Sequence, residues 1–208
     1  MLSITATFDD DQWFTGGRDT TVDKLGRLFG NLIRQKAREL KERPPEFQDA
    51  ASVTELRTQL SELNRQWRDQ EVTGLISQIR QRRDKAQGVK IAARLGRLRE
   101  MLKEEEGKDT DISPDSLRAL LVFFNRLENF RLPEFSLTPE AEVYLRWKDG
   151  PKRLFAVHFE NHRRVRFTVF SPNPRHSDFV NRLSGIETVD TVLQTAENAC
   201  SVRKWICD

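Results

Sequence analysis

Two histidines and a glutamate occupy alternate positions in the C-terminal half of the chain. His158, Glu160 and His162 share one parity of an extended strand, and imidazole and carboxylate groups are common metal ligands. Residues i and i+4 of a strand lie about 13 Å apart, so the histidines reach one ion only if the chain turns at Asn161. We therefore expect a solvated strand edge here, with no metal site and no cofactor. A small metal-dependent nuclease that uses His158 and Glu160 is the alternative.

No other pattern in the sequence indicates catalysis. The chain has three histidines in total and lacks the motifs H-E-x-x-H, G-x-x-x-x-G-K-S, G-x-S-x-G and G-x-G-x-x-G. We therefore name no catalytic residue. The sequence favours a protein that acts by binding.

Basic residues concentrate between Arg80 and Lys103. This segment holds nine Lys or Arg residues against two acidic ones, and an acidic stretch follows it. Arginine dominates, and its planar guanidinium suits two-point contacts with phosphate. Helical spacing places several of these cations on one face. The predicted nucleic-acid-binding residues are Arg80, Arg83, Lys90, Arg94 and Arg97. The alternative is a solvated helix whose Arg stems cover an apolar stripe and whose charged ends pair with acids.

The stretch from 142 to 170 alternates strictly between apolar and polar residues. Turn signals at Asp149-Gly150 and Asn161-His162 divide it into three runs, which predicts a three-stranded antiparallel meander. One parity is apolar and should face the core. The other parity is polar and places an aromatic ring among cations, which favours a binding surface for nucleic acid or an acidic protein. The predicted partner-binding residues on it are Tyr144, Arg146, Arg164 and Arg166.

Residues 1–106 are predicted to form a helical domain. A capping box at Ser52 starts a long helix, and a second helix follows Gly88, so the two are expected to form a long helical hairpin. Each has a narrow apolar stripe, which cannot bury enough surface alone and needs a partner. A second copy of the chain is one candidate, through the hairpin. A purely structural oligomerisation module is therefore another functional alternative.

An acidic linker over 107–112 and a domain over 113–208 complete the predicted organisation. Ser113 caps a helix whose wide apolar face should cover the sheet. After the sheet, we expect a short helix around Phe179 and Leu183 and a last amphipathic helix that includes Val189 and Ala196. Helices on one face of an antiparallel sheet give an α+β fold.

The composition indicates a folded protein outside the membrane. Charged residues make up 32% of the chain, but the apolar residues are too regularly spaced for disorder. The sequence has no run of about eighteen apolar residues, and its first residues do not have the pattern of a signal peptide. We expect a soluble, cytoplasmic protein with no membrane partner.

One segment carries a resemblance to known sequences. Residues Leu132 to Trp147 read L-P-E-F-S-L-T-P-E-A-E-V-Y-L-R-W. Together with the helix from Ser113, they resemble uncharacterised bacterial proteins that tend to be encoded near toxin-antitoxin or phage-defence genes. Those proteins carry a T-P-x-G turn and a strand that ends in Trp, and Ala141 stands here in place of the glycine. The resemblance implies a bacterial defence or toxin-antitoxin setting.

These observations together predict a non-enzymatic accessory or adaptor protein. Its partner is expected to be another protein, and DNA or RNA is the second candidate partner because of the basic residues between Arg80 and Lys103.

Overall fold

The structure of the chain is a computed structural model. It describes residue 35 and residues 50–82, 84–107, 109–173, 175–176 and 178–207; the side chains of residues 50–53 and 56 are not part of this description. The basic residue Arg83 and nearly all of the first fifty residues therefore lie outside the described part. Contacts divide the chain into two compact units, Met1–Leu63 and Asn64–Asp208. The predicted linker over 107–112 lies within the second unit.

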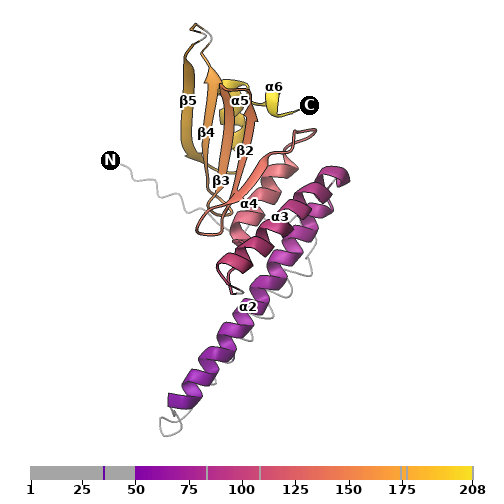
Figure 1. Cartoon of the computed structure of the whole chain (residues 1–208), viewed down its shortest axis with the longest axis vertical. Helices are drawn as coiled ribbons and strands as arrows, with labels where there is room; N and C mark the ends of the chain where they lie inside the picture. The colour runs from indigo at the N-terminus through magenta and orange to yellow at the C-terminus, as the bar shows by residue number, and fades with distance from the viewer. Residues whose placement is uncertain are drawn as a thin grey trace, which may run out of the picture. The chain divides into compact units, whose positions relative to one another are not determined.

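A five-stranded antiparallel sheet forms the centre of the second unit (Figure 1). The strands follow one another in space as in the sequence, as a meander. They are β1 (Glu134–Leu137), β2 (Val143–Asp149), β3 (Arg153–Phe159), β4 (Val165–Pro172) and β5 (Val180–Glu187). The prediction of three strands was wrong, because β1 and β5 flank the three that the alternation indicated. The α+β class is correct.

The two unpredicted strands lack the signal that identified the others. β1 is four residues long, too short to show an alternation. The side chains of β5 that share a face with the core residues of β4 are Asn181, Leu183, Gly185 and Glu187, of which only one is a large apolar residue. The short helix expected around Phe179 and Leu183 was therefore wrong, and this segment pairs along its whole length with β4.

Helices cover one face of this sheet. α4 contacts β2 and β3, while α5 contacts β4 and β5, and α3 lies beside β1. The described helices are α2 (Ala50–Arg80), α3 (Lys85–Glu105), α4 (Pro114–Asn125), α5 (Val192–Cys200) and α6 (Arg203–Ile206). α4 begins as predicted: Ser113 Oγ accepts a hydrogen bond from Ser116 N at 3.3 Å, and Pro114 occupies the first turn.

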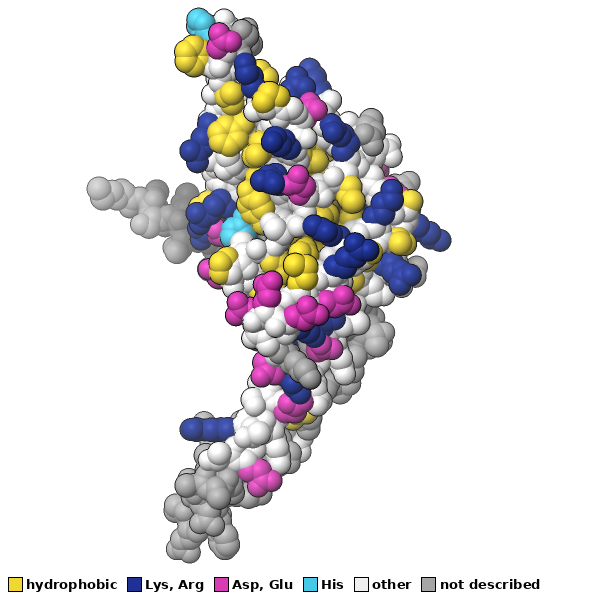
Figure 2. Space-filling view, in the orientation of Figure 1, with side chains coloured by type: hydrophobic (Ala, Val, Ile, Leu, Met, Phe, Trp, Pro, Cys, Tyr) yellow, Lys and Arg dark blue, Asp and Glu magenta, His cyan; other side chains and the backbone are white. Residues whose placement is uncertain are grey.

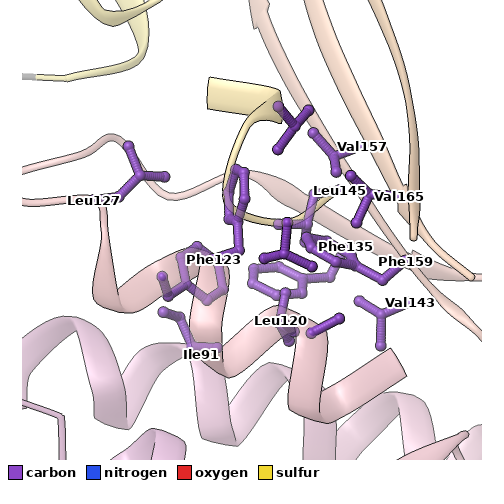
Figure 3. Packing of buried hydrophobic residues seen from close by; sticks show 14 of the residues in the cluster. Ile91, Leu120, Phe123, Leu127, Phe135, Val143, Leu145, Val157, Phe159 and Val165 are labelled. Atoms are coloured by element: carbon purple, nitrogen blue, oxygen red, sulfur yellow. The ribbon is translucent and has the colours of Figure 1, made fainter. Parts of the chain in front are cut away.

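One hydrophobic core joins the helices to the covered face of the sheet. In Figure 3, Leu120 and Phe123 of α4 point toward Val143 of β2 and Phe159 of β3. The Phe123 and Phe159 rings meet edge to face with centroids 5.4 Å apart. Ile91 of α3 belongs to the same cluster, and other residues of α2 and α3 also contribute. The predicted parity of the three central strands is correct, since all nine of their apolar residues on this face are buried.

Ion pairs tie α2, α3 and the segment before α4 together. Arg99 of α3 contacts Asp111 at 2.6 Å and Asp69 of α2 at 2.9 Å. Lys103 contacts Asp69 at 2.6 Å, and this hydrogen bond, aided by the nearby Arg99 charge, lowers the pKa of Asp69 below its usual value. Asp111, which was predicted to lie in a linker, is buried in this network.

None of the described helices is long and apolar enough to cross a lipid bilayer.

Candidate nucleic-acid interface

The second face of the sheet carries no helix among the described elements, and its side chains point outward. Tyr144 of β2 stands opposite His158 of β3, which stands opposite Arg166 of β4. The side chains of Arg146 and Arg166 are 49% and 61% exposed, whereas Tyr144 is half-buried between its neighbours. The predicted polar parity is therefore correct, and we call this surface the open face.

Cations and apolar groups alternate across the open face. Figure 2 shows Lys and Arg side chains interspersed with apolar side chains over the sheet. Leu154 and Phe170 are half-buried, and the Arg182 guanidinium of β5 lies 5.9 Å from the centre of the Phe170 ring. Lys148 and Arg182 have no carboxylate partner among the residues that the structure describes. The face therefore combines exposed positive charge with aromatic surface.

Two glutamates form ion pairs with the predicted arginines of the open face. Arg146 Nε donates to Glu134 Oε2 at 2.8 Å. Glu160 accepts from two arginines, Arg164 at 3.0 Å and Arg166 at 2.8 Å. The Arg146–Glu134 pair is exposed on both sides, and such pairs stabilise a fold by only about 0 to 1 kcal/mol, so a ligand phosphate can compete for Arg146 at small cost. The Glu160 side chain is only 17% exposed, whereas both of its arginines are exposed.

α3 presents a row of exposed cations beside this sheet. Lys90, Arg94 and Arg97 recur at the spacing of one helical face, and all three are exposed. None of them forms an ion pair within the described ranges. Arg80, also exposed, ends α2 close to the first turn of α3, where a side chain at Gly88 would lie 2.8 Å from the Arg80 carbonyl oxygen. Four of the five predicted nucleic-acid-binding residues are thus accessible.

Three other cations of the basic segment, Arg82, Arg99 and Lys103, serve the fold instead. The Arg82 guanidinium is buried beside the stacked rings of Phe124 and Phe130, 5.3 Å from each centre, and donates to the Leu127 carbonyl at 3.1 Å. Burial lowers the pKa of Arg82 from its usual value. Arg99 is held in the ion-pair network with Asp111. The number of basic residues in this segment therefore does not show which of them are exposed and free of ion pairs.

One pocket joins the α3 row to the open face. It measures about 320 Å³ and is lined by Arg94 of α3, by Glu134, Phe135 and Ser136 of β1, and by Tyr144 and Arg146 of β2. α3 reaches this position because it packs beside β1 at the edge of the sheet. The two predicted sets, the basic helix face and the polar sheet face, therefore meet at Arg94, Tyr144 and Arg146.

The predicted metal-ligand candidates do not converge. His158 Nε2 lies 2.7 Å from Glu142 Oε2, and Glu160 pairs with the two arginines described above. His162 Nδ1 faces Asp115 at 3.8 Å. The described residues include no group of three or more His, Cys, Asp or Glu that could hold a metal ion. The nuclease alternative stays a prediction without a geometric site.

Three residues of the open face were missed by the sequence interpretation. Lys148 and Phe170 have the same parity as Tyr144 and Thr168 in their own strands, so the alternation already contained the signal. Arg182 could not be identified, because it lies on β5.

Comparison with protein-family models, with curated proteins and with solved structures finds no match to this chain.

Proposed function

We propose that the protein is a non-enzymatic accessory protein that binds single-stranded nucleic acid along α3 and across the open face of its sheet. The observation that carries the proposal is the pocket in which Arg94 of α3 meets Tyr144 and Arg146 of β2. It gives a strand one continuous path from a row of cations to an aromatic surface. A further protein partner and a bacterial defence setting stay predictions.

The α3 row supplies contacts to phosphates. Lys90, Arg94 and Arg97 follow one another at about 6 Å and about 4.5 Å along the helix axis, so neighbouring phosphates of one strand can each reach a cation. Their exposure matters, because each phosphate neutralised releases bound counterions and contributes affinity that depends on salt. This row alone would bind any polyanion.

The open face supplies the preference for unpaired bases. Tyr144 lies beside Arg94 and Arg146 in the pocket, so a base whose phosphate contacts these cations can stack on the tyrosine ring. Phe170 under Arg182 offers a second ring on the same face. Bases in a duplex are already stacked and enclosed, so we expect tighter binding of a single strand than of a duplex of equal length.

The test is a titration of labelled oligonucleotides followed by fluorescence anisotropy at several salt concentrations. On a single strand, the logarithm of the affinity should fall with the logarithm of the salt concentration by about 0.7 for each phosphate neutralised. Replacing Arg94→Glu and Arg97→Glu together should flatten this slope. The matched control is Arg203→Glu with Lys204→Glu on α6, which changes the net charge equally at two exposed positions.

Several outcomes would contradict the proposal. They are no binding at any salt concentration, an affinity that does not change with salt, and an equal loss in the α3 and α6 variants. A polyglutamate chain that competes as well as a single-stranded oligonucleotide of equal charge would also contradict it. That result would indicate an acidic protein as the partner instead.

A further inference from the structure

The two edges of the sheet differ in how they are protected. β1, at one edge, has four residues and lies beside α3. β5, at the other edge, has eight residues, and no described strand pairs with its outer side (Figure 1). A long free edge exposes unpaired backbone N–H and C=O groups, which are a template for another strand. Among the described residues, β1 is therefore shielded by α3, and β5 is available for pairing on its outer side.

β5 lacks several of the features by which proteins usually block such an edge, although it carries two charges, Arg182 on the open face and Glu187 on the covered face. It contains no proline and no lysine, and it pairs with β4 without a bulge from Val180 to Glu187. Its apolar side chains are unusually exposed: Val180 is 41% exposed and Ile186 49%. Phe179, directly before the strand, is 66% exposed. Val180 and Ile186 lie within the strand, where a second strand paired to its outer edge would stand beside them.

We propose that β5 pairs antiparallel with β5 of a second copy of this chain. A two-fold axis at Leu183 sets each Leu183 opposite its own copy and each Val180 opposite the Ile186 of the second copy. Val180 and Ile186 share the open face, so two exposed apolar pairs form, one on each side of the axis. The strand is in this respect complementary to itself, which a symmetric dimer requires.

Neighbouring registers are less favourable. Moving the axis to Ser184 sets Arg182 opposite Ile186 and leaves Val180 without an apolar partner. Moving it to Arg182 sets two arginines directly opposite each other, which is destabilising. An axis placed between two residues shifts the register by one residue, and it would pair a residue of the open face with a residue of the covered face. The exposed apolar residues therefore select one register.

The dimer would extend the open face. A two-fold axis perpendicular to the sheet reverses the direction of the strand but keeps each face on its own side. The two sheets then form one continuous sheet with both open faces on the same side. The pairing does not depend on nucleic acid, so it can be tested separately from the proposed function.

The first test is the mass of the purified chain in solution, measured by sedimentation at increasing concentrations after nuclease treatment. We expect a dimer of the 24.3 kDa chain. Ile186→Lys should weaken the dimer at least about tenfold, since it places a charge at the apolar pair. Val122→Lys is the matched control, because Val122 is 41% exposed and lies on α4, which contacts β2 and β3. Circular dichroism checks that both variants are folded.

The second test reads the register. In a background with Cys200→Ser and Cys207→Ser, Leu183→Cys should be cross-linked into a dimer by a short bismaleimide. Asn181→Cys should not be, because its copy lies four residues further along the paired strand. A monomer at all concentrations up to about 100 μM, a dimer that only Val122→Lys weakens, or cross-linking at 181 but not at 183 would overturn the proposal.

Discussion

The two faces of the sheet are built from the same strands but differ in what covers them. On the covered face, Phe159 and its neighbours are buried against α4 and α5 in a single core. On the open face, Tyr144 is half-buried and Arg166 is exposed. Because neighbouring residues of a strand point to opposite faces, the core and the proposed binding surface are encoded at alternate positions. Substitutions one residue apart should therefore affect different properties.

The largest expected difference is in the stability of two phenylalanine variants. Phe159→Ala removes a fully buried ring and should lower the free energy of unfolding by about 3 to 5 kcal/mol. Phe170→Ala removes a half-buried ring from the open face, and we expect a loss of at most about 1.5 kcal/mol. Urea unfolding of the full chain measures both. Equal losses in the two variants would mean that both faces are core.

A second difference concerns binding. Tyr144→Ala should weaken the binding of a single strand by about 1 to 3 kcal/mol, the range of a lost stacking contact, with little change in stability. Tyr144→Phe keeps the ring and should retain most of the affinity. Fluorescence anisotropy at one fixed salt concentration compares the variants. If Tyr144→Phe loses as much as Tyr144→Ala, the hydroxyl and not the ring carries the contact, against the stacking proposed here.

The smallest expected effect is a gain. Glu160→Gln removes the carboxylate that pairs with Arg164 and Arg166, so the two guanidinium groups become available to phosphates. Affinity should rise by about 0.5 to 1 kcal/mol, and more clearly at low salt. Asp190→Asn is the matched control, since Asp190 pairs with Arg126 away from the open face. Weaker binding by Glu160→Gln would show that this carboxylate positions the arginines and does not compete for them.

The faces of the central strands could be predicted from the sequence, because successive side chains of a strand point to opposite faces whatever packs against the sheet. Val157 and Arg166 could each be assigned to a face from parity alone. The edge strand β5 could not, because an edge needs fewer apolar residues than a central strand and Gly185 with Glu187 conceals the alternation. The extent of the sheet was therefore less predictable than its orientation.

The exposed residues of the candidate site could be predicted from the sequence, but their meeting in one pocket could not. Helical spacing correctly separated the exposed Lys90 and Arg94 from Arg99, which the fold uses in an ion-pair network. That Arg94 meets Tyr144 depends on α3 packing beside β1, and neither residue carries a signal of that contact. Arg94 and Tyr144 are fifty positions apart in the sequence, and a local pattern contains no information about packing over that distance.

The most direct test of the account is to locate a bound strand on the protein. A single-stranded oligonucleotide carrying a photoreactive base can be cross-linked by ultraviolet light, and the attached peptide identified by mass spectrometry. We expect cross-links within β2, at or next to Tyr144, and within α3 near Arg94, and we expect Arg94→Glu with Arg97→Glu to abolish both. Cross-links confined to α5 or α6, or a pattern that this double variant leaves unchanged, would contradict the claim that the open face is the binding surface.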